Sequence, residues 1–259
     1  MMIPELVAVP RGRFIMGASD GPHPEDGEGP AREIELSPYQ IGLTAVSNAE
    51  FRAFTDATGY RTQAELRGTS QVFQGRLAAP DHHPVLFAQT PWWRLVKGAS
   101  WRHPNGVEFA APNHPVVHVT RADTLAYCAW AGVRLPTEAE WENAAMPQGG
   151  ITPHIWDGVF PDAPVAPARP KAVTDARPNA HGLYHCCGNV WEWVADRFSK
   201  LHSPRPDQNP KGALNGKTYV VKGGSYLCAP SYCARFRPSS RRPEIPDAAT
   251  CHLGFRVAK

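Results

Sequence analysis

Proline restricts regular structure in this chain more than any other residue type, because it fixes φ and removes a backbone hydrogen-bond donor. The chain has 27 prolines and 22 glycines among its 259 residues. Its 8 tryptophans supply large apolar surfaces that can anchor irregular backbone without long strand ladders. These features together predict an ordered but loop-rich fold with short helices and strands.

Composition narrows the class of protein further. Apolar residues make up 42% and charged residues 20% of the chain, which excludes disorder, and no apolar run is long enough to span a membrane. The formal net charge is only +3, and apart from Arg241 and Arg242 the basic residues are scattered, so a nucleic-acid partner is not expected. Residues 1–5 lack the pattern of a secretory signal, which predicts a cytoplasmic location for the chain as it stands.

The local patterns predict three helices and six short strands in one α+β domain spanning residues 1–259. Capping boxes and stop residues predict helices over residues 48–58, between Thr120 and Gly132, and from Thr137 to Pro147. The predicted strands are residues 6–9, 13–16, 34–36, 116–119, 218–221 and 254–257. Residues 60–115 and 147–180 carry little periodicity and are expected to be packed or functional loops.

Residues 222–237 are the segment where chemistry is most strongly indicated. Cys228 and Cys233 lie five residues apart and are followed by Arg235 and Arg237, whose positive charge could make the thiols more acidic. The two thiolates could also share a soft metal such as Cu(I). The spacing alone is equally compatible with one buried and one incidental cysteine.

Motifs along nearly the whole chain resemble the formylglycine-generating enzyme family, the sulfatase-modifying factors. They are GRFIMG (12–17), VSNAEF (46–51), WW (92–93), VKGASWRHP (96–104), HPVVHV (114–119), RLPTEAEWE (134–142), GNVWEW (188–193) and LGFR (253–256). Several of these also occur in non-catalytic members and in ergothioneine-type sulfoxide synthases. The Gly-Gly-Ser-x-x-Cys-x-x-x-x-Cys segment at residues 223–233 is the part specific to the oxidase.

The resemblance implies an irregular, C-type-lectin-like α+β fold and a defined reaction. Family members use O2 and Cu(I) to convert a cysteine, in a Cys-x-Pro-x-Arg segment of an unfolded or nascent sulfatase, to Cα-formylglycine. By position, Cys228 and Cys233 would be the copper ligands, with Cys233 nearer the substrate. Ser225 and Trp191 would line the oxygen side of the site.

The resemblance also implies a set of peptide-binding residues. They are Trp101, Arg102, Tyr232, Arg235 and His252. His252 stands where many members carry an asparagine that contacts the substrate backbone, so the peptide groove is expected to differ there.

Family members bind two calcium ions, and this chain departs from both sites. The second site would draw on His185, Gly188, Val190 and Glu192. Imidazole is a poor calcium ligand, so this site is expected to be degenerate. The first site would begin at His154, where an asparagine is expected, and its later loop is replaced by the proline-rich residues 163–171. Calcium binding is therefore doubtful.

The remaining cysteines and histidines favour structural roles. In His185-Cys186-Cys187 adjacent side chains rarely point at one ion, so packing is favoured over a metal. Cys128 is expected in the core, and Cys251 has no assignable role.

Two alternatives to a sulfatase-maturing oxidase stay open. One is an oxidase of the same fold that acts on a different peptide, and the other is a non-catalytic binding protein on this scaffold. Retention of both Cys228 and Cys233 argues against the second. A sulfoxide synthase would need a three-histidine iron site from an additional helical region, for which the chain has no room.

Overall fold

The computed structural model describes residues 3–146 and 152–259 of the chain. Its α-helices are α1 (Asn48–Thr58), α2 (Gln63–Arg67), α3 (Arg121–Ala131) and α4 (Glu138–Ala145). Its strands are β1 (Leu6–Val9), β2 (Gly12–Met16), β3 (Arg32–Leu36), β4 (Tyr39–Gly42), β5 (Thr69–Phe73), β6 (Trp93–Lys97), β7 (Gly158–Val159), β8 (Ala163–Pro164), β9 (Trp191–Arg197), β10 (Asp207–Gln208), β11 (Tyr219–Lys222), β12 (Arg241–Glu244) and β13 (Leu253–Phe255). Short 3-10 helices occupy Pro24–Asp26, Gln74–Arg76 and Pro80–His82.

Each α-helix begins at a capping box, in which the N-cap hydroxyl and the carboxylate three residues later satisfy each other's backbone amides. The three predicted helices are confirmed as α1, α3 and α4. Helix α4 ends at Ala145, and Pro147, the predicted limit, lies outside the described residues. Helix α2 was not predicted, although its Thr62–Glu65 box has the same signature as the others.

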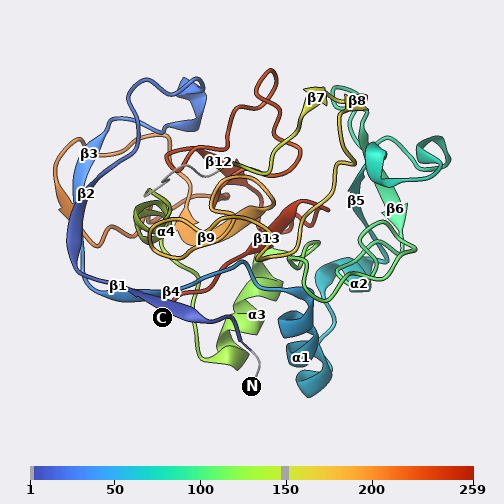
Figure 1. Ribbon diagram of the computed structural model, residues 1–259, viewed down its shortest axis with the longest axis horizontal. Coiled ribbons are helices and arrows are strands. Elements are labelled where there is room, and N and C mark those ends of the chain that lie inside the picture. Colours follow the sequence, from blue (N-terminus) through green and yellow to red (C-terminus); the bar gives the residue numbers. More distant parts are fainter. Residues whose placement is uncertain (1–2, 147–151) are drawn as a thin grey trace.

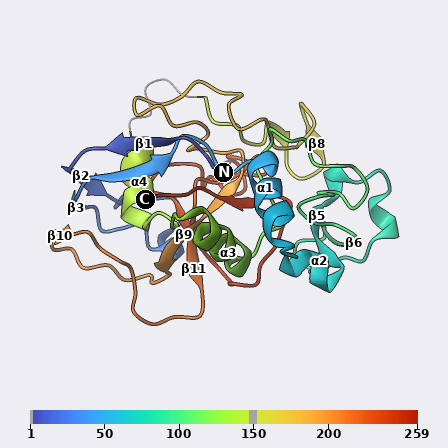
Figure 2. The ribbon, with the colours of Figure 1, turned by 90° about the horizontal axis from the view of Figure 1, so that it is seen from below.

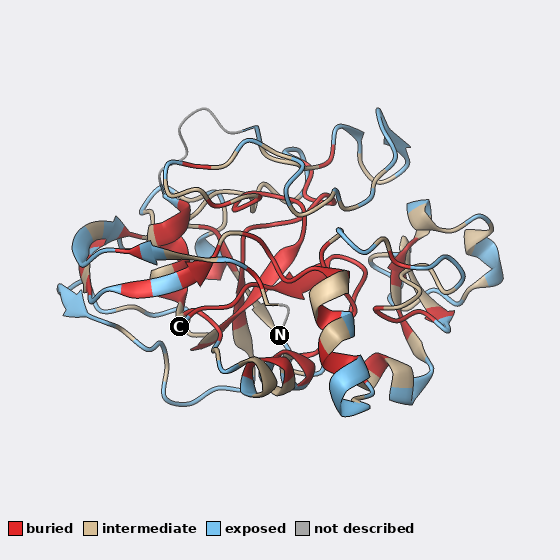
Figure 3. Ribbon diagram, turned by 60° about the horizontal axis from the view of Figure 1, so that its bottom comes forward, coloured by how far each residue is buried: buried red, intermediate tan, exposed pale blue. Residues whose placement is uncertain are grey.

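A four-stranded sheet with the order β12-β11-β9-β13 forms the centre of the molecule. Strands β9 and β13 run parallel, and the other neighbours are antiparallel. Helix α4 lies against β9 and β11, and the aromatic core includes Phe51, Tyr127, Trp193 and Phe255. Figure 3 shows buried backbone concentrated here, whereas exposed residues lie mainly on the outer loops and the outer helix faces.

Smaller sheets surround this centre. Strand β1 pairs with β4, β2 and β10 flank β3, and β5 pairs with β6 at the far end of the molecule. Strands β7 and β8 form a two-residue ladder in an otherwise irregular stretch. The predicted α+β, loop-rich, single-domain fold is confirmed, and no helix among the described residues has the length and apolarity that a membrane crossing needs.

The predicted strand over residues 116–119 is wrong. These residues join no strand, because the backbone at His118 has φ of 60°, in the left-handed region that interrupts an extended chain. The His118 ring is fully buried, with Nδ1 2.8 Å from the Ser70 hydroxyl and Nε2 2.9 Å from the Pro104 carbonyl oxygen. Residues 60–115, expected as loops, contain α2, β5 and β6.

Candidate active site

The segment with the two predicted thiols leaves the central sheet through a glycine pair. Strand β11 ends at Lys222, and Gly223 and Gly224 follow with φ of 93° and 72°. A Cβ at Gly224 would lie 2.5 Å from the carbonyl oxygen of Arg235, so only glycine permits this approach. The amides of Tyr232 and Cys233 then donate to the Ala229 carbonyl at 3.0 and 2.8 Å, which turns the chain back on itself.

This turn brings Cys228 and Cys233 together as a thiol pair. Their sulfurs lie 2.9 Å apart, and both cysteines are free. Cys228 is buried, and desolvation raises the pKa of its thiol. A hydrogen bond from Cys228, supported by the positive charge of Arg235, lowers the pKa of the half-buried Cys233. The arrangement therefore favours a thiolate at Cys233 next to a protonated Cys228.

Ser225 connects the thiol pair to His252. The Ser225 amide donates to the Cys228 sulfur at 3.4 Å, and its hydroxyl lies 3.0 Å from His252 Nδ1. Because that hydroxyl already accepts from the Leu227 amide at 3.2 Å, its own proton is available for Nδ1. Burial lowers the pKa of His252, which keeps the ring neutral with its proton on Nε2.

A cleft of about 200 Å³ opens beside His252 and is called the His252 cleft below. Trp93, Arg242, Glu244 and Thr250 are among its lining residues. The His252 ring packs edge-on against Trp93 with centroids 4.9 Å apart. Two buried atoms of this lining, Arg242 Nε and Thr250 Oγ1, have no hydrogen-bond partner. Buried polar atoms are normally paired, so these two atoms are unsatisfied donors or acceptors beside the cleft.

Arg242 is a site residue that sequence reasoning missed. It was noted only as part of a short basic pair, but strand β12 places its guanidinium over the ring of Trp191, 5.3 Å from the centroid. Glu244 holds the same guanidinium through an ion pair. Trp191 itself is buried in β9 and belongs to the same core cluster as Cys228, and its role beside the oxygen side of the site stays a prediction. The pairing of β12 with β11, which no local pattern indicated, is what carries Arg242 there.

Tyr232 and Arg235 lie beside Cys233 but differ in availability. Tyr232 is 52% exposed and stacks on Phe160, with ring centroids 4.7 Å apart. The Arg235 guanidinium is paired with Asp26 and Glu25, so its charge is already matched within the protein. Arg235 therefore acts on the neighbouring thiol more directly than on an incoming ligand.

Trp101 and Arg102 make their contacts elsewhere in the molecule. The fully buried Trp101 packs against Phe51, and its indole donates to Glu65 at 3.3 Å. Arg102 donates to Glu65 at 3.2 Å and to Thr55 at 3.3 Å. These contacts tie α1 to α2 and do not involve the thiol pair.

The residues of the implied calcium sites do not suit calcium. Both oxygens of Glu192 are bonded to Arg256 at 3.0 Å, and one also accepts from the Trp141 indole at 2.6 Å. His185 Nε2 lies 3.1 Å from the Ala172 carbonyl, and His154 Nε2 lies 2.8 Å from the Arg169 carbonyl. The two imidazoles therefore hold the backbone of the proline-rich stretch, and the one carboxylate is neutralised by an arginine. Gly188 and Val190 could offer only backbone carbonyl oxygens as calcium ligands, and these cannot replace the missing carboxylates.

The other predicted cysteines are packed in the core. Cys128 and Cys186 are buried in apolar clusters, as expected. The Cys251 sulfur accepts from the Tyr226 hydroxyl and the Phe73 amide, each at 3.3 Å.

Two close, free sulfurs at Cys228 and Cys233 are a soft donor set of the kind that Cu(I) prefers.

Comparison with known proteins identifies the class. PvdO of Pseudomonas aeruginosa has the same fold, with a TM-score of 0.71 at 24% identity over 98% of this chain and 94% of that chain. The chain thus has a loop-rich α+β fold that it shares with PvdO.

A family model described as the sulfatase-modifying factor enzyme 1-like domain matches residues 1–259, and the chain belongs to this family. The formylglycine-generating enzyme of Bos taurus is 43% identical over 98% of this chain and 74% of the relative. The inactive Cα-formylglycine-generating enzyme 2 of Mus musculus is 37% identical over 98% of this chain and 85% of the relative. The predicted family and enzyme class are confirmed by these matches.

Proposed function

We propose that this protein is a copper-dependent oxidase that converts a peptidyl cysteine, in a Cys-x-Pro-x-Arg segment of a sulfatase, to Cα-formylglycine. The observation that carries the proposal is the thiol pair, with sulfurs 2.9 Å apart, joined through Ser225 to a cleft with orphaned polar atoms. The relatives named formylglycine-generating enzymes support the same reaction class.

The overall reaction balances as a peptidyl thiol, O2, two protons and two electrons from an external thiol reductant giving an aldehyde, hydrogen sulfide and water. Cys228 and Cys233 would hold Cu(I), which, when bound, supplies the activation of O2. Cys228 is buried, and Arg235 favours the thiolate form of Cys233. Ser225 donates its amide to the Cys228 sulfur and so orients that ligand.

The His252 cleft would bind the substrate backbone. Arg242 Nε and the proton on His252 Nε2 are donors, and Thr250 Oγ1 can donate or accept. The exposed Tyr232 ring, stacked on Phe160, offers an aromatic surface against which a substrate proline can pack. Glu244, which already pairs with Arg242, lines the same cleft and could also contact a substrate arginine.

The alternative with a different peptide substrate keeps this chemistry and changes only the cleft. His252 is the residue that favours it, because it stands where many members of the family carry an asparagine that contacts the substrate backbone. A purely binding role is less well supported, since the close thiol pair serves no purpose in a peptide-binding surface.

Mass spectrometry of a Cys-x-Pro-x-Arg peptide, incubated with the protein, Cu(I), a thiol reductant and O2, tests the proposal. An aldehyde product that the Cys233→Ser variant does not make is the expected result. Copper binding without turnover of this peptide would favour a different substrate. The absence of both copper binding and turnover would contradict the oxidase proposal.

A further inference from the structure

A cavity of about 310 Å³, here called the basic cavity, lies between β3, the end of β9 and residues 199–213. Its charged lining residues are Arg32, Arg197, Arg205, Asp207, Lys211 and Arg241. Five of these six are basic. None of the residues that form the thiol pair or the His252 cleft belongs to this lining, so the cavity is a separate feature.

Arg32 is the unusual member of the lining, because its charge is buried without an acidic partner. Arg32 is only 8% exposed. The guanidinium contacts neutral groups: the Pro30 carbonyl at 3.2 Å, His202 Nδ1 at 3.0 Å and the Met16 sulfur at 3.4 Å. Among the described residues, no carboxylate oxygen lies within ion-pair distance of it. Buried charges are normally paired, so this cation is unusual in having no carboxylate in direct contact.

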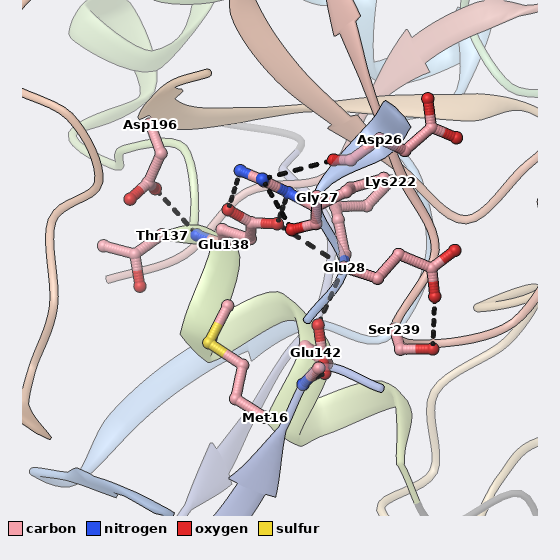
Figure 4. A network of polar contacts seen from close by, with 12 residues as sticks. Met16, Asp26, Gly27, Glu28, Thr137, Glu138, Glu142, Asp196, Lys222 and Ser239 are labelled. Atoms are coloured by element: carbon pink, nitrogen blue, oxygen red, sulfur yellow. Dashed lines mark hydrogen bonds and ion pairs between the residues drawn. The ribbon is translucent and has the colours of Figure 1, made fainter. Parts of the chain in front are cut away.

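The carboxylates of the network beside the cavity, Glu138 and Glu142 (Figure 4), favour the Arg32 charge at longer range but are bonded to other cations. The carboxylate of Glu138 is held by Arg241 at 2.6 and 2.9 Å. Glu142 accepts from Lys222 at 2.8 Å. Two carboxylates are thus matched by two cations of their own, and Arg32 adds a further positive charge at the cavity wall.

The two aspartates close to the cavity, Asp196 and Asp207, each accept a hydrogen bond from a backbone amide. Asp196 accepts from the Glu138 amide at 2.7 Å, and burial raises its pKa to about 7. Asp207 accepts from the Gln208 amide at 2.7 Å. Neither forms an ion pair with the basic residues of the lining, and the five basic lining residues outnumber Asp207, its one acidic residue.

The rim of the cavity adds exposed basic side chains as further donors. Within residues 3–146 and 152–259, the side chains of Arg205 and Lys211 have no hydrogen-bond or ion-pair partner. Arg197 donates to the Gly216 carbonyl and packs on Tyr219, so it is more firmly held. A buried guanidinium and exposed cations at the rim form a site that an anion can enter and neutralise.

We propose that the basic cavity binds a small molecule carrying a tetrahedral oxyanion, such as inorganic phosphate, sulfate or a phosphate monoester. Planar guanidinium groups match two oxygens of such an anion, and the ammonium of Lys211 adds a point charge. The cavity has more room than a bare oxyanion needs, which accommodates an attached organic group. The proposal is independent of the oxidase activity.

Isothermal titration of the full chain with inorganic phosphate, inorganic sulfate and glycerol phosphate tests the proposal, with sodium chloride at matched ionic strength as the reference. Saturable binding of at least one oxyanion, with none for chloride, is expected. Tighter binding of glycerol phosphate than of phosphate would assign the site to a monoester, and the reverse order to an inorganic ion. No saturable binding of any oxyanion would overturn the proposal.

Variants locate the binding. Arg205→Ala combined with Lys211→Ala should raise the Kd at least about tenfold, because charge-assisted hydrogen bonds are lost. The matched control, Arg52→Ala with Lys97→Ala, removes the same charge from exposed positions outside the cavity and should leave the Kd unchanged. Arg32→Met should remove binding, because it deletes the guanidinium while keeping an unbranched side chain in the buried stem position. Equal weakening in the control pair, or full binding by Arg32→Met, would contradict the assignment.

Discussion

Two basic regions of this protein handle charge in opposite ways. Along the thiol segment, residues 222–237, every basic side chain has a carboxylate partner. The pairs are Lys222 with Glu142, Arg235 with Asp26, and Arg237 with Glu28. In the basic cavity Arg32, Arg205 and Lys211 have no such partner among the described residues. Paired charges position the thiols, whereas unpaired charges leave a site that an external anion can complete.

The segment that supplies the acidic partners of Arg235 and Arg237 lies far from the thiol segment in the sequence. Glu25, Asp26 and Glu28 belong to the first thirty residues, and they close over residues 235–237. His23 adds a contact of 2.6 Å between its Nε2 and the Cys233 carbonyl. The thiol pair is therefore held between the central sheet on one side and an N-terminal loop on the other.

Replacing either sulfur should have the largest effect. Cys228→Ser and Cys233→Ser should each lower Cu(I) affinity by more than about 100-fold, since loss of a ligand exceeds the loss caused by changing its outer partners. A competition titration against a Cu(I) chelator measures this. The control is Cys128→Ser, whose sulfur lies in α3. Unchanged affinity in either site variant would remove the ligand assignment.

Breaking one buried ion pair should have the next largest effect. Asp26→Asn leaves Arg235 with only the exposed Glu25, and should lower the free energy of unfolding by about 2 to 3 kcal/mol. Glu33→Gln breaks the exposed pair with Arg13 and should change it by less than about 0.5 kcal/mol. Urea denaturation of both variants gives the comparison. Equal losses of unfolding free energy in the two variants would show that the ion pair of the thiol segment is no stronger than an exposed surface pair.

Acid should destabilise the protein through buried neutral histidines, and His118 is the clearest case. Burial lowers its pKa to about 4 from an ordinary value of 6.5. The unfolded chain therefore binds the proton more readily, so the stabilisation is complete above about pH 6.5 and is lost as the pH falls toward 4. In His118→Gln, the loss of unfolding free energy between pH 7.5 and 4.5 should be smaller by about 2 kcal/mol. An unchanged pH dependence would count against this.

Changing Arg242 should alter peptide binding more than chemistry. Arg242→Gln removes the orphaned Nε donor from the His252 cleft and should raise KM about tenfold with little change in kcat. A peptide with serine in place of the substrate cysteine allows the same change to be measured as a Kd without turnover. Arg61→Gln, on an exposed loop, is the control. A fall in kcat alone would place Arg242 outside the binding step.

Calcium removal should have the smallest effect. Because Arg256 neutralises Glu192 and two imidazoles hold the proline-rich stretch, a calcium chelator should shift Tm by less than about 1 °C. His185→Ala should lower the free energy of unfolding by about 1 kcal/mol through loss of one neutral hydrogen bond. A Tm that rises with added calcium would restore the family's metal site.

Local patterns were most informative where side chains near in sequence satisfy backbone hydrogen-bond groups, as at the helix starts. The Ser47–Glu50 and Thr137–Glu140 boxes predicted two helix starts correctly, because a cap depends on residues only three positions apart. Strand β9 was missed, since its residues are buried on both faces and show no alternation of apolar and polar positions. The error at His118 has a related cause, because a left-handed φ is not encoded by a β-branched run.

The amino-acid sequence by itself determined the loop-rich fold class, the helix starts, the family and the two cysteines, because each depends on composition, local spacing or a contiguous motif. Only the tertiary structure decided which charges are paired, where Arg242 lies, and that Trp101 supports α1 and α2 instead of the thiol pair. These properties depend on contacts between residues such as Asp26 and Arg235, which lie far apart in the chain. The folded structure determines which partner contacts each buried charge, and that contact determines whether the charge is free to bind an external ligand.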